Sequence, residues 1–76
     1  MQIITKAIFY DEEKKQELKL RYTFDLLDVC NANEGENDQT VITDRSTGMR
    51  TNVKISFDKY LELVKKTFHH VTEIYE

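Results

Sequence analysis

The chain has one cysteine, two glycines, no proline and no long apolar run. A single thiol, Cys30, cannot form a disulfide within the chain, whereas small secreted domains usually carry an even number of cysteines. Residues 1–6 lack the basic start and the apolar core that are typical of a signal peptide. No apolar run approaches the roughly 18 residues that span a bilayer. We therefore expect a cytoplasmic protein with no membrane partner.

The sequence contains no internal repeat and no Gly/Ser-rich stretch that could link two domains. We expect a single domain that comprises residues 1–76. Leu, Ile, Val and Phe number 21, which is enough for a small core, although 33% of the residues are charged. A core of this size often supplies only about 3–5 kcal/mol, so such domains commonly gain further stability from a disulfide, a metal or a partner subunit.

Two glycines, Gly35 and Gly48, are too few for a phosphate-binding or dinucleotide-binding loop. Cys30 and the adjacent His69 and His70 could indicate catalysis or metal binding. Neighbouring residues of a helix point about 100° apart, however, and cannot readily ligate one ion. Nothing beside Cys30 favours a thiolate. We expect no enzymatic activity, no metal and no cofactor.

Residues 31–39 form an acidic, amide-rich stretch that we expect to be a solvated loop. An EF-hand calcium loop needs Asp or Asn at positions 1, 3 and 5 and Gly at position 6. If Gly35 occupies the sixth position, Cys30, Ala32 and Glu34 occupy the others. Residues 30–35 therefore do not match the EF-hand calcium-loop pattern.

The net charge of −3 conceals an uneven distribution along the chain. Residues 1–24 carry a charge of +1 and residues 45–76 carry +2, whereas residues 25–44 carry six acids and no base. This middle segment should have a strongly negative local potential, which makes it a candidate surface for a basic partner protein. Its acids are Asp25, Asp28, Glu34, Glu36, Asp38 and Asp44.

The C-terminal third has the period of an amphipathic helix, which we expect from residue 57 to about residue 74. Ser56 is a suitable N-cap. Phe57, Tyr60, Leu61, Val64, Phe68, Val71 and Tyr75 would form its main apolar stripe. A second, neighbouring set widens the apolar arc beyond what one sheet face requires, and it is a candidate self-association surface. This second set comprises Leu63, Thr67, His70 and Ile74.

The rest of the chain favours β-structure. Residues 2–10 and 18–26 are predicted strands, and residues 40–45 and 49–55 are predicted to form a hairpin. Its turn could place either Val41 or Ile42 opposite Val53. After the second strand, either a bulge shifts the register or Asp25 caps a short helical turn through Cys30.

Together these elements predict an α+β fold, a small antiparallel β-meander of three to four strands with the C-terminal amphipathic helix packed on one face. Because the connections are short, we expect strands that follow one another in sequence to be neighbours.

The expected function is that of a small non-enzymatic protein-interaction module, which self-associates, binds a basic protein surface, or does both. A nucleic-acid-binding domain that uses the basic hairpin at residues 45–54 is the alternative, through Arg45, Arg50 and Lys54. The acidic isoelectric point of about 5.3 makes nucleic acid the less expected partner. We would expect a small acidic protein without catalytic motifs in a phage, plasmid or other mobile element, although no motif indicates that origin.

Overall fold

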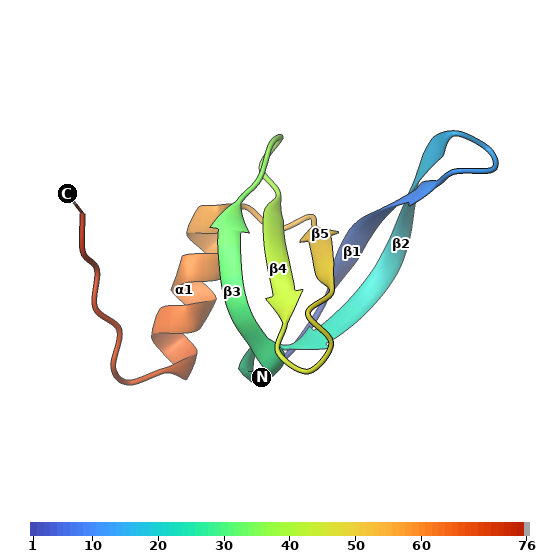
Figure 1. Ribbon diagram of the computed structural model, residues 1–76. Coiled ribbons are helices and arrows are strands. Elements are labelled where there is room, and N and C mark those ends of the chain that lie inside the picture. Colours follow the sequence, from blue (N-terminus) through green and yellow to red (C-terminus); the bar gives the residue numbers. More distant parts are fainter. Residues whose placement is uncertain (76) are drawn as a thin grey trace.

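The computed structural model describes residues 1–75 and shows a five-stranded antiparallel sheet with one C-terminal α-helix (Figure 1). The predicted α+β class is therefore confirmed. Its elements are β1 (Gln2–Asp11), β2 (Gln16–Asp25), the 3-10 helix η1 (Leu26–Asp28), β3 (Val29–Glu34), β4 (Thr40–Asp44), β5 (Arg50–Val53) and α1 (Phe57–Thr67).

The additional strand is β3, which begins before the predicted 31–39 loop and occupies its first half. Asn31, Asn33 and Glu34 have little intrinsic preference for a strand, and for this reason the sequence favours a loop there. In the structure β4 offers a free edge, against which Asn31 pairs with Thr43 and Asn33 with Val41. Backbone pairing with β4 therefore overrides the local preference of β3.

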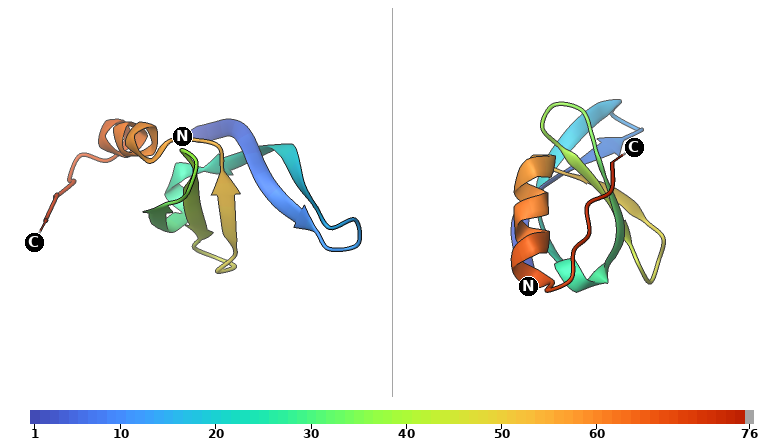
Figure 2. Two further views of the ribbon diagram at one scale, coloured as in Figure 1. Left: turned by 90° about the horizontal axis from the view of Figure 1, so that it is seen from above. Right: turned by 90° about the vertical axis from the view of Figure 1, so that its left-hand side faces the viewer.

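The sheet has the strand order β2-β1-β5-β4-β3, so β2 and β3 lie at opposite edges although they follow one another in sequence. The expectation that all consecutive strands are neighbours is wrong at this step. Only the three residues of η1 join the two edges, so the sheet must curl until its edges approach one another (Figure 2). Two backbone hydrogen bonds hold this corner: Leu26 N–H donates to the Met1 carbonyl at 3.0 Å, and Arg45 N–H donates to the Asp28 carbonyl at 2.7 Å.

The short helical turn after β2 confirms one of the two predicted alternatives. Asp25 caps η1 by accepting a hydrogen bond from the Leu27 N–H. The turn is shorter than expected, because it ends at Asp28 rather than Cys30. A register shift between Val29 and Asn31 then accommodates Cys30 at the start of β3.

The hairpin of β4 and β5 has neither of the two predicted registers. Thr40 lies opposite Val53, and Ile42 lies opposite Thr51. The reason is a wide turn at residues 45–48, which is closed by hydrogen bonds between the backbones of Asp44 and Met49 and of Gly48 and Asp44. A turn longer than expected moves every later pair along the strand.

The curled sheet has an inner face that carries the core and an outer face exposed to solvent. Alternation along β5 shows the division: Thr51 and Val53 are buried, whereas Arg50 and Asn52 are exposed. Four strands, η1 and α1 contribute to the core, which consists of Ile3, Ala7, Phe24, Leu26, Ile42, Val53 and Tyr60.

Helix α1 begins as predicted and ends about seven residues early. Ser56 is the N-cap and accepts a hydrogen bond from the Lys59 N–H at 3.2 Å. Tyr60 is buried in the core, but the backbone turns extended at Phe68, where φ is −109° and ψ is 134°. The sequence from residue 67 to residue 72, Thr-Phe-His-His-Val-Thr, consists of weak helix formers. The predicted stripe residues Phe68, Val71 and Tyr75 therefore remain exposed in an extended tail.

Candidate binding hollow

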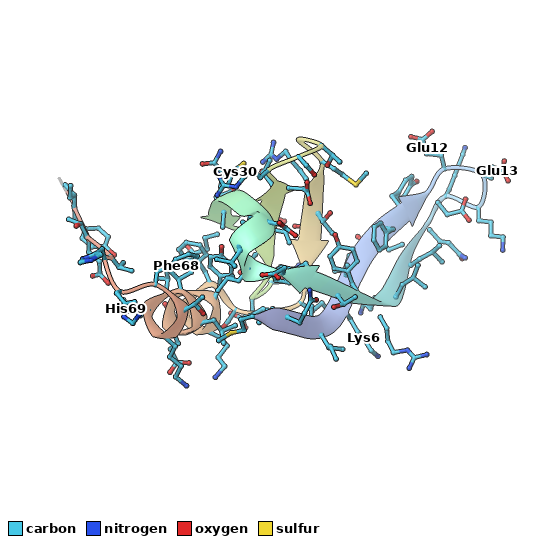
Figure 3. The ribbon with its side chains drawn as sticks, turned by 90° about the horizontal axis from the view of Figure 1, so that it is seen from below. Lys6, Glu12, Glu13, Cys30, Phe68 and His69 are labelled. Atoms are coloured by element: carbon cyan, nitrogen blue, oxygen red, sulfur yellow. The ribbon has the colours of Figure 1, made fainter. Side chains whose placement is uncertain are left out.

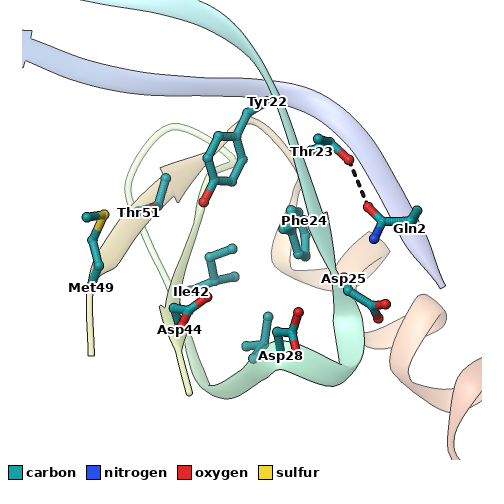
Figure 4. Close-up of a pocket in the computed structure, with 11 residues that line it drawn as sticks. Gln2, Tyr22, Thr23, Phe24, Asp25, Asp28, Ile42, Asp44, Met49 and Thr51 are labelled. Atoms are coloured by element: carbon teal, nitrogen blue, oxygen red, sulfur yellow. Dashed lines mark hydrogen bonds between the residues drawn. The ribbon is translucent and has the colours of Figure 1, made fainter. Parts of the chain in front are cut away.

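A hollow of about 280 Å³ lies where β2, η1, β4 and β5 converge (Figure 4). Tyr22 and Phe24 line it from β2, and Ile42 and Thr51 line it from β4 and β5. The curl of the sheet produces this hollow, because η1 draws the two edge strands together at only one end. Its wall combines aromatic rings with several polar groups.

Asp44 enters the hollow from the end of β4, and the turn that follows holds its carboxylate. Its Oδ1 atom accepts hydrogen bonds from the Ser46 hydroxyl at 2.7 Å, the Ser46 N–H at 2.8 Å and the Thr47 N–H at 3.0 Å. These contacts, the Ser46 hydroxyl foremost, lower the pKa of Asp44 below its usual range. The group is thus a fixed negative charge at neutral pH.

Asp28 and Asp25 occupy different positions around the same hollow. Asp28, in η1, is exposed and faces the hollow across from Asp44 (Figure 4). Asp25 lies on the far side of β2, where its Oδ1 accepts from the Leu27 N–H at 2.9 Å and sits 3.4 Å from the N-terminal ammonium of Met1. The Leu27 N–H and the ammonium lower the pKa of Asp25. Asp25 is therefore a rim residue with a structural role.

Thr51 is a polar residue that is buried in the wall of the hollow. It is only 6% exposed, and within residues 1–75 its hydroxyl takes part in no hydrogen bond. No fully covered polar side-chain atom of the described chain lacks a partner, so the Thr51 hydroxyl reaches solvent through the hollow. Tyr22, which is half-buried, points its phenol into the same space (Figure 4).

The six predicted acids therefore form two groups. Asp25, Asp28 and Asp44 surround the hollow, whereas Glu34, Glu36 and Asp38 lie at the β3–β4 turn. Val29 pairs with Asp44 and Glu34 pairs with Thr40, so the two groups lie at opposite ends of one hairpin. The five residue steps along β3 from Val29 to Glu34 cover about 17 Å. Antiparallel pairing has divided a segment that is continuous in sequence.

Sequence reasoning missed Tyr22 and Thr51 as residues of the hollow. Tyr22 belongs to the alternating apolar series of β2 and resembles an ordinary core residue. Thr51 does carry a signal, because it is a polar residue in phase with the buried Val53. That signal could be read only once the register of β5 was known.

The predicted self-association set is not a continuous helical face. Leu63 is half-buried and packs against the core, and the Thr67 hydroxyl contacts the Met1 sulfur at 3.6 Å. His70 and Ile74 lie beyond the end of α1. The helical grouping is therefore wrong, while self-association itself stays a prediction.

Cys30 and the histidines lie on different parts of the molecule (Figure 3). Cys30 is an exposed free thiol whose Sγ contacts the Thr43 carbonyl at 3.6 Å, and His69 lies in the tail after α1. Among residues 1–75, no three His, Cys, Asp or Glu side chains are arranged to hold a metal ion. Within the same residues, none of the helices has both the length and the apolar character needed to cross a membrane.

Comparison with known proteins adds no relative: the chain matches no protein family, and no curated protein or solved structure is significantly similar to it.

Proposed function

We propose that this protein is a small non-enzymatic binding module that takes a cationic side chain of a protein partner into the hollow. The observation that carries the proposal is the Thr51 hydroxyl, which belongs to a buried residue and opens only onto a hollow flanked by Asp28 and Asp44. A lysine or arginine head group would supply hydrogen-bond donors to all three groups.

The size and chemistry of the hollow support a side chain rather than a small-molecule substrate. Its volume of about 280 Å³ lies at the lower end of the roughly 300–1,000 Å³ of typical ligand pockets, which favours a group as small as one side chain. The Tyr22 ring offers an aromatic surface to a cation. All the turn hydrogen bonds to Asp44 use Oδ1, so within residues 1–75 its Oδ2 is available as an acceptor. The single cysteine, exposed and unpaired, supports a cytoplasmic location.

Fluorescence anisotropy with a labelled peptide of alternating glycine and arginine tests this proposal. We expect Asp28→Asn to weaken binding roughly tenfold, because it removes a charged acceptor while preserving shape. Thr51→Val, which is isosteric, should weaken binding severalfold without changing net charge.

The β3–β4 turn provides a matched control. Asp38→Asn removes the same charge at the opposite end of the hairpin, and it should leave the peptide Kd within twofold of the parent value. If Asp38→Asn weakens binding as much as Asp28→Asn, or if Thr51→Val has no effect, binding reflects overall acidity and the proposal is wrong.

A further inference from the structure

The outer face of the sheet is basic, although the protein as a whole is acidic. Directly paired residues share a face of the sheet, and successive residues alternate between faces, so the register assigns each side chain. Within residues 1–75, the acids of the outer face on the strands are Glu17 and Asp25, at the two ends of β2. Asp25 is already paired with the N-terminal ammonium. Five exposed bases lie between them or on adjacent strands: Lys6, Lys19, Arg21, Arg50 and Lys54.

These bases come from the adjacent strands β2, β1 and β5 and from Lys54, the residue directly after β5. Lys6 on β1 lies directly opposite Arg21 on β2, and the Lys54 N–H donates to the Lys6 carbonyl at 2.8 Å. Lys54, Lys6 and Arg21 thus form one row across the sheet, with about 5 Å between the backbones of neighbours. Lys6 projects away from the core (Figure 3). A second row of outer-face residues runs parallel to this one. In it, Lys19 on β2 lies opposite Ile8 on β1, and Ile8 lies opposite Asn52 on β5.

The face also presents apolar surface among the charges. Ile4 is 81% exposed and Tyr10 is 61% exposed, in line along β1 with Lys6. Ile4, Arg21, Tyr22 and Thr23 line a shallow depression of about 400 Å³. An apolar depression beside a guanidinium suits an unstacked base, which can stack on the Arg plane or lie on the aliphatic surface.

From this arrangement we infer that the outer face binds single-stranded nucleic acid, with phosphates along the basic rows and bases against Ile4 and Tyr10. A single strand fits better than a duplex, because the face is a broad sheet surface on which splayed bases can lie. The β1–β2 turn next to Tyr10 adds no net charge to this face, because Glu12 and Glu13 are followed by Lys14 and Lys15. The inference goes beyond the proposed function and rests on the bases of the outer face together with Ile4 and Tyr10, none of which lines the hollow.

This differs from the hairpin alternative suggested by the sequence. Arg50 and Lys54 do belong to the basic face, but the Arg45 guanidinium donates to the Val29 carbonyl at 3.4 Å, at the corner beside η1. The main contributors, Lys6, Lys19 and Arg21, come from the β1–β2 hairpin. Strand pairing of β1 with β5 brings the two groups of bases together.

The test measures binding of a labelled mixed-sequence single-stranded DNA oligonucleotide by fluorescence anisotropy across a salt series. Five phosphate contacts predict a slope of log K against log salt of about −3.5. Lys6→Gln with Arg21→Gln should lower affinity at least tenfold and reduce the slope to about −2. Lys59→Gln with Lys66→Gln on α1 removes the same charge elsewhere, and it should leave both quantities nearly unchanged.

Ile4→Ala supplies a separate readout of base contact. The side chain is exposed, so its loss should leave folding intact. We expect weaker binding with an unchanged salt slope, because the change affects stacking and leaves the charges in place. The inference is overturned if the strand fails to bind at about 50 mM salt, if the α1 control weakens binding equally, or if a duplex of the same length binds as tightly.

Discussion

At the scale of single residues, the carboxylates of the middle segment have unequal roles. A backbone N–H and the N-terminal ammonium hold Asp25, and backbone and hydroxyl donors hold Asp44, which lowers both pKa values, whereas Asp28 is exposed and faces the hollow. Composition alone presents all six acids as equivalent. Their difference arises from geometry, because only an acid at the first position of a turn or a helix meets several free N–H groups.

The lowered pKa values predict a loss of stability in acid. A carboxylate whose pKa is lower in the folded than in the unfolded state contributes stability above its unfolded-state pKa, and this contribution disappears as pH falls through the folded-state value. The pKa values of Asp25 and Asp44 in the folded protein both lie below the usual value of 3.8. Thermal unfolding between about pH 5 and about pH 2 should show a falling Tm. Asp44→Asn should flatten this dependence, and a slope equal to that of the parent would contradict the assignment.

At the scale of elements, local sequence predicted types better than boundaries or partners. Strand β2 alternates apolar and polar residues, β1 is rich in β-branched and aromatic residues, and the N-cap Ser56 precedes a clear apolar period, so these elements were expected where they occur. The end of α1 at Thr67 and the existence of β3 were not expected from the sequence. Apolar periodicity continues past Thr67, but Phe68, Val71 and Tyr75 stay exposed, and weak helix formers then do not sustain the helix.

A pair of proline substitutions tests the end of α1. Thr72→Pro lies in the exposed tail, so it should change the free energy of unfolding by no more than about 0.5 kcal/mol. Glu62→Pro, also exposed, interrupts α1 and should cost about 3 kcal/mol or more. Urea denaturation measures both. A large loss on Thr72→Pro would show that the helix continues through this position.

At the scale of the whole molecule, the connection through η1 determines the shape. Three residues join the two edges of the sheet, the resulting curl forms the hollow, and Leu26 fills the corner with 1% exposure. The same curl separates an acidic hollow from a basic outer face. A protein with a net charge of −3 can therefore offer surfaces of both signs.

The corner supplies the most sensitive site for a stability measurement. Leu26→Ala should lower the free energy of unfolding by about 2–5 kcal/mol, because it removes fully buried methyl groups and leaves a cavity. Leu27→Ala is the matched control: this neighbour is 55% exposed and should cost under about 1 kcal/mol. Denaturant titration compares them, and similar losses would mean that Leu26 does not close the corner.

The sequence by itself determined the α+β class, the positions of β1, β2, β4, β5 and the start of α1, and the presence of six uncompensated acids, because period, capping and charge are local properties. Only the tertiary structure decided which acids meet around the hollow, that β3 is a strand, and that bases from β1, β2 and β5 share one face. Strand order and register decide those neighbours, and both depend on contacts between residues far apart in the chain.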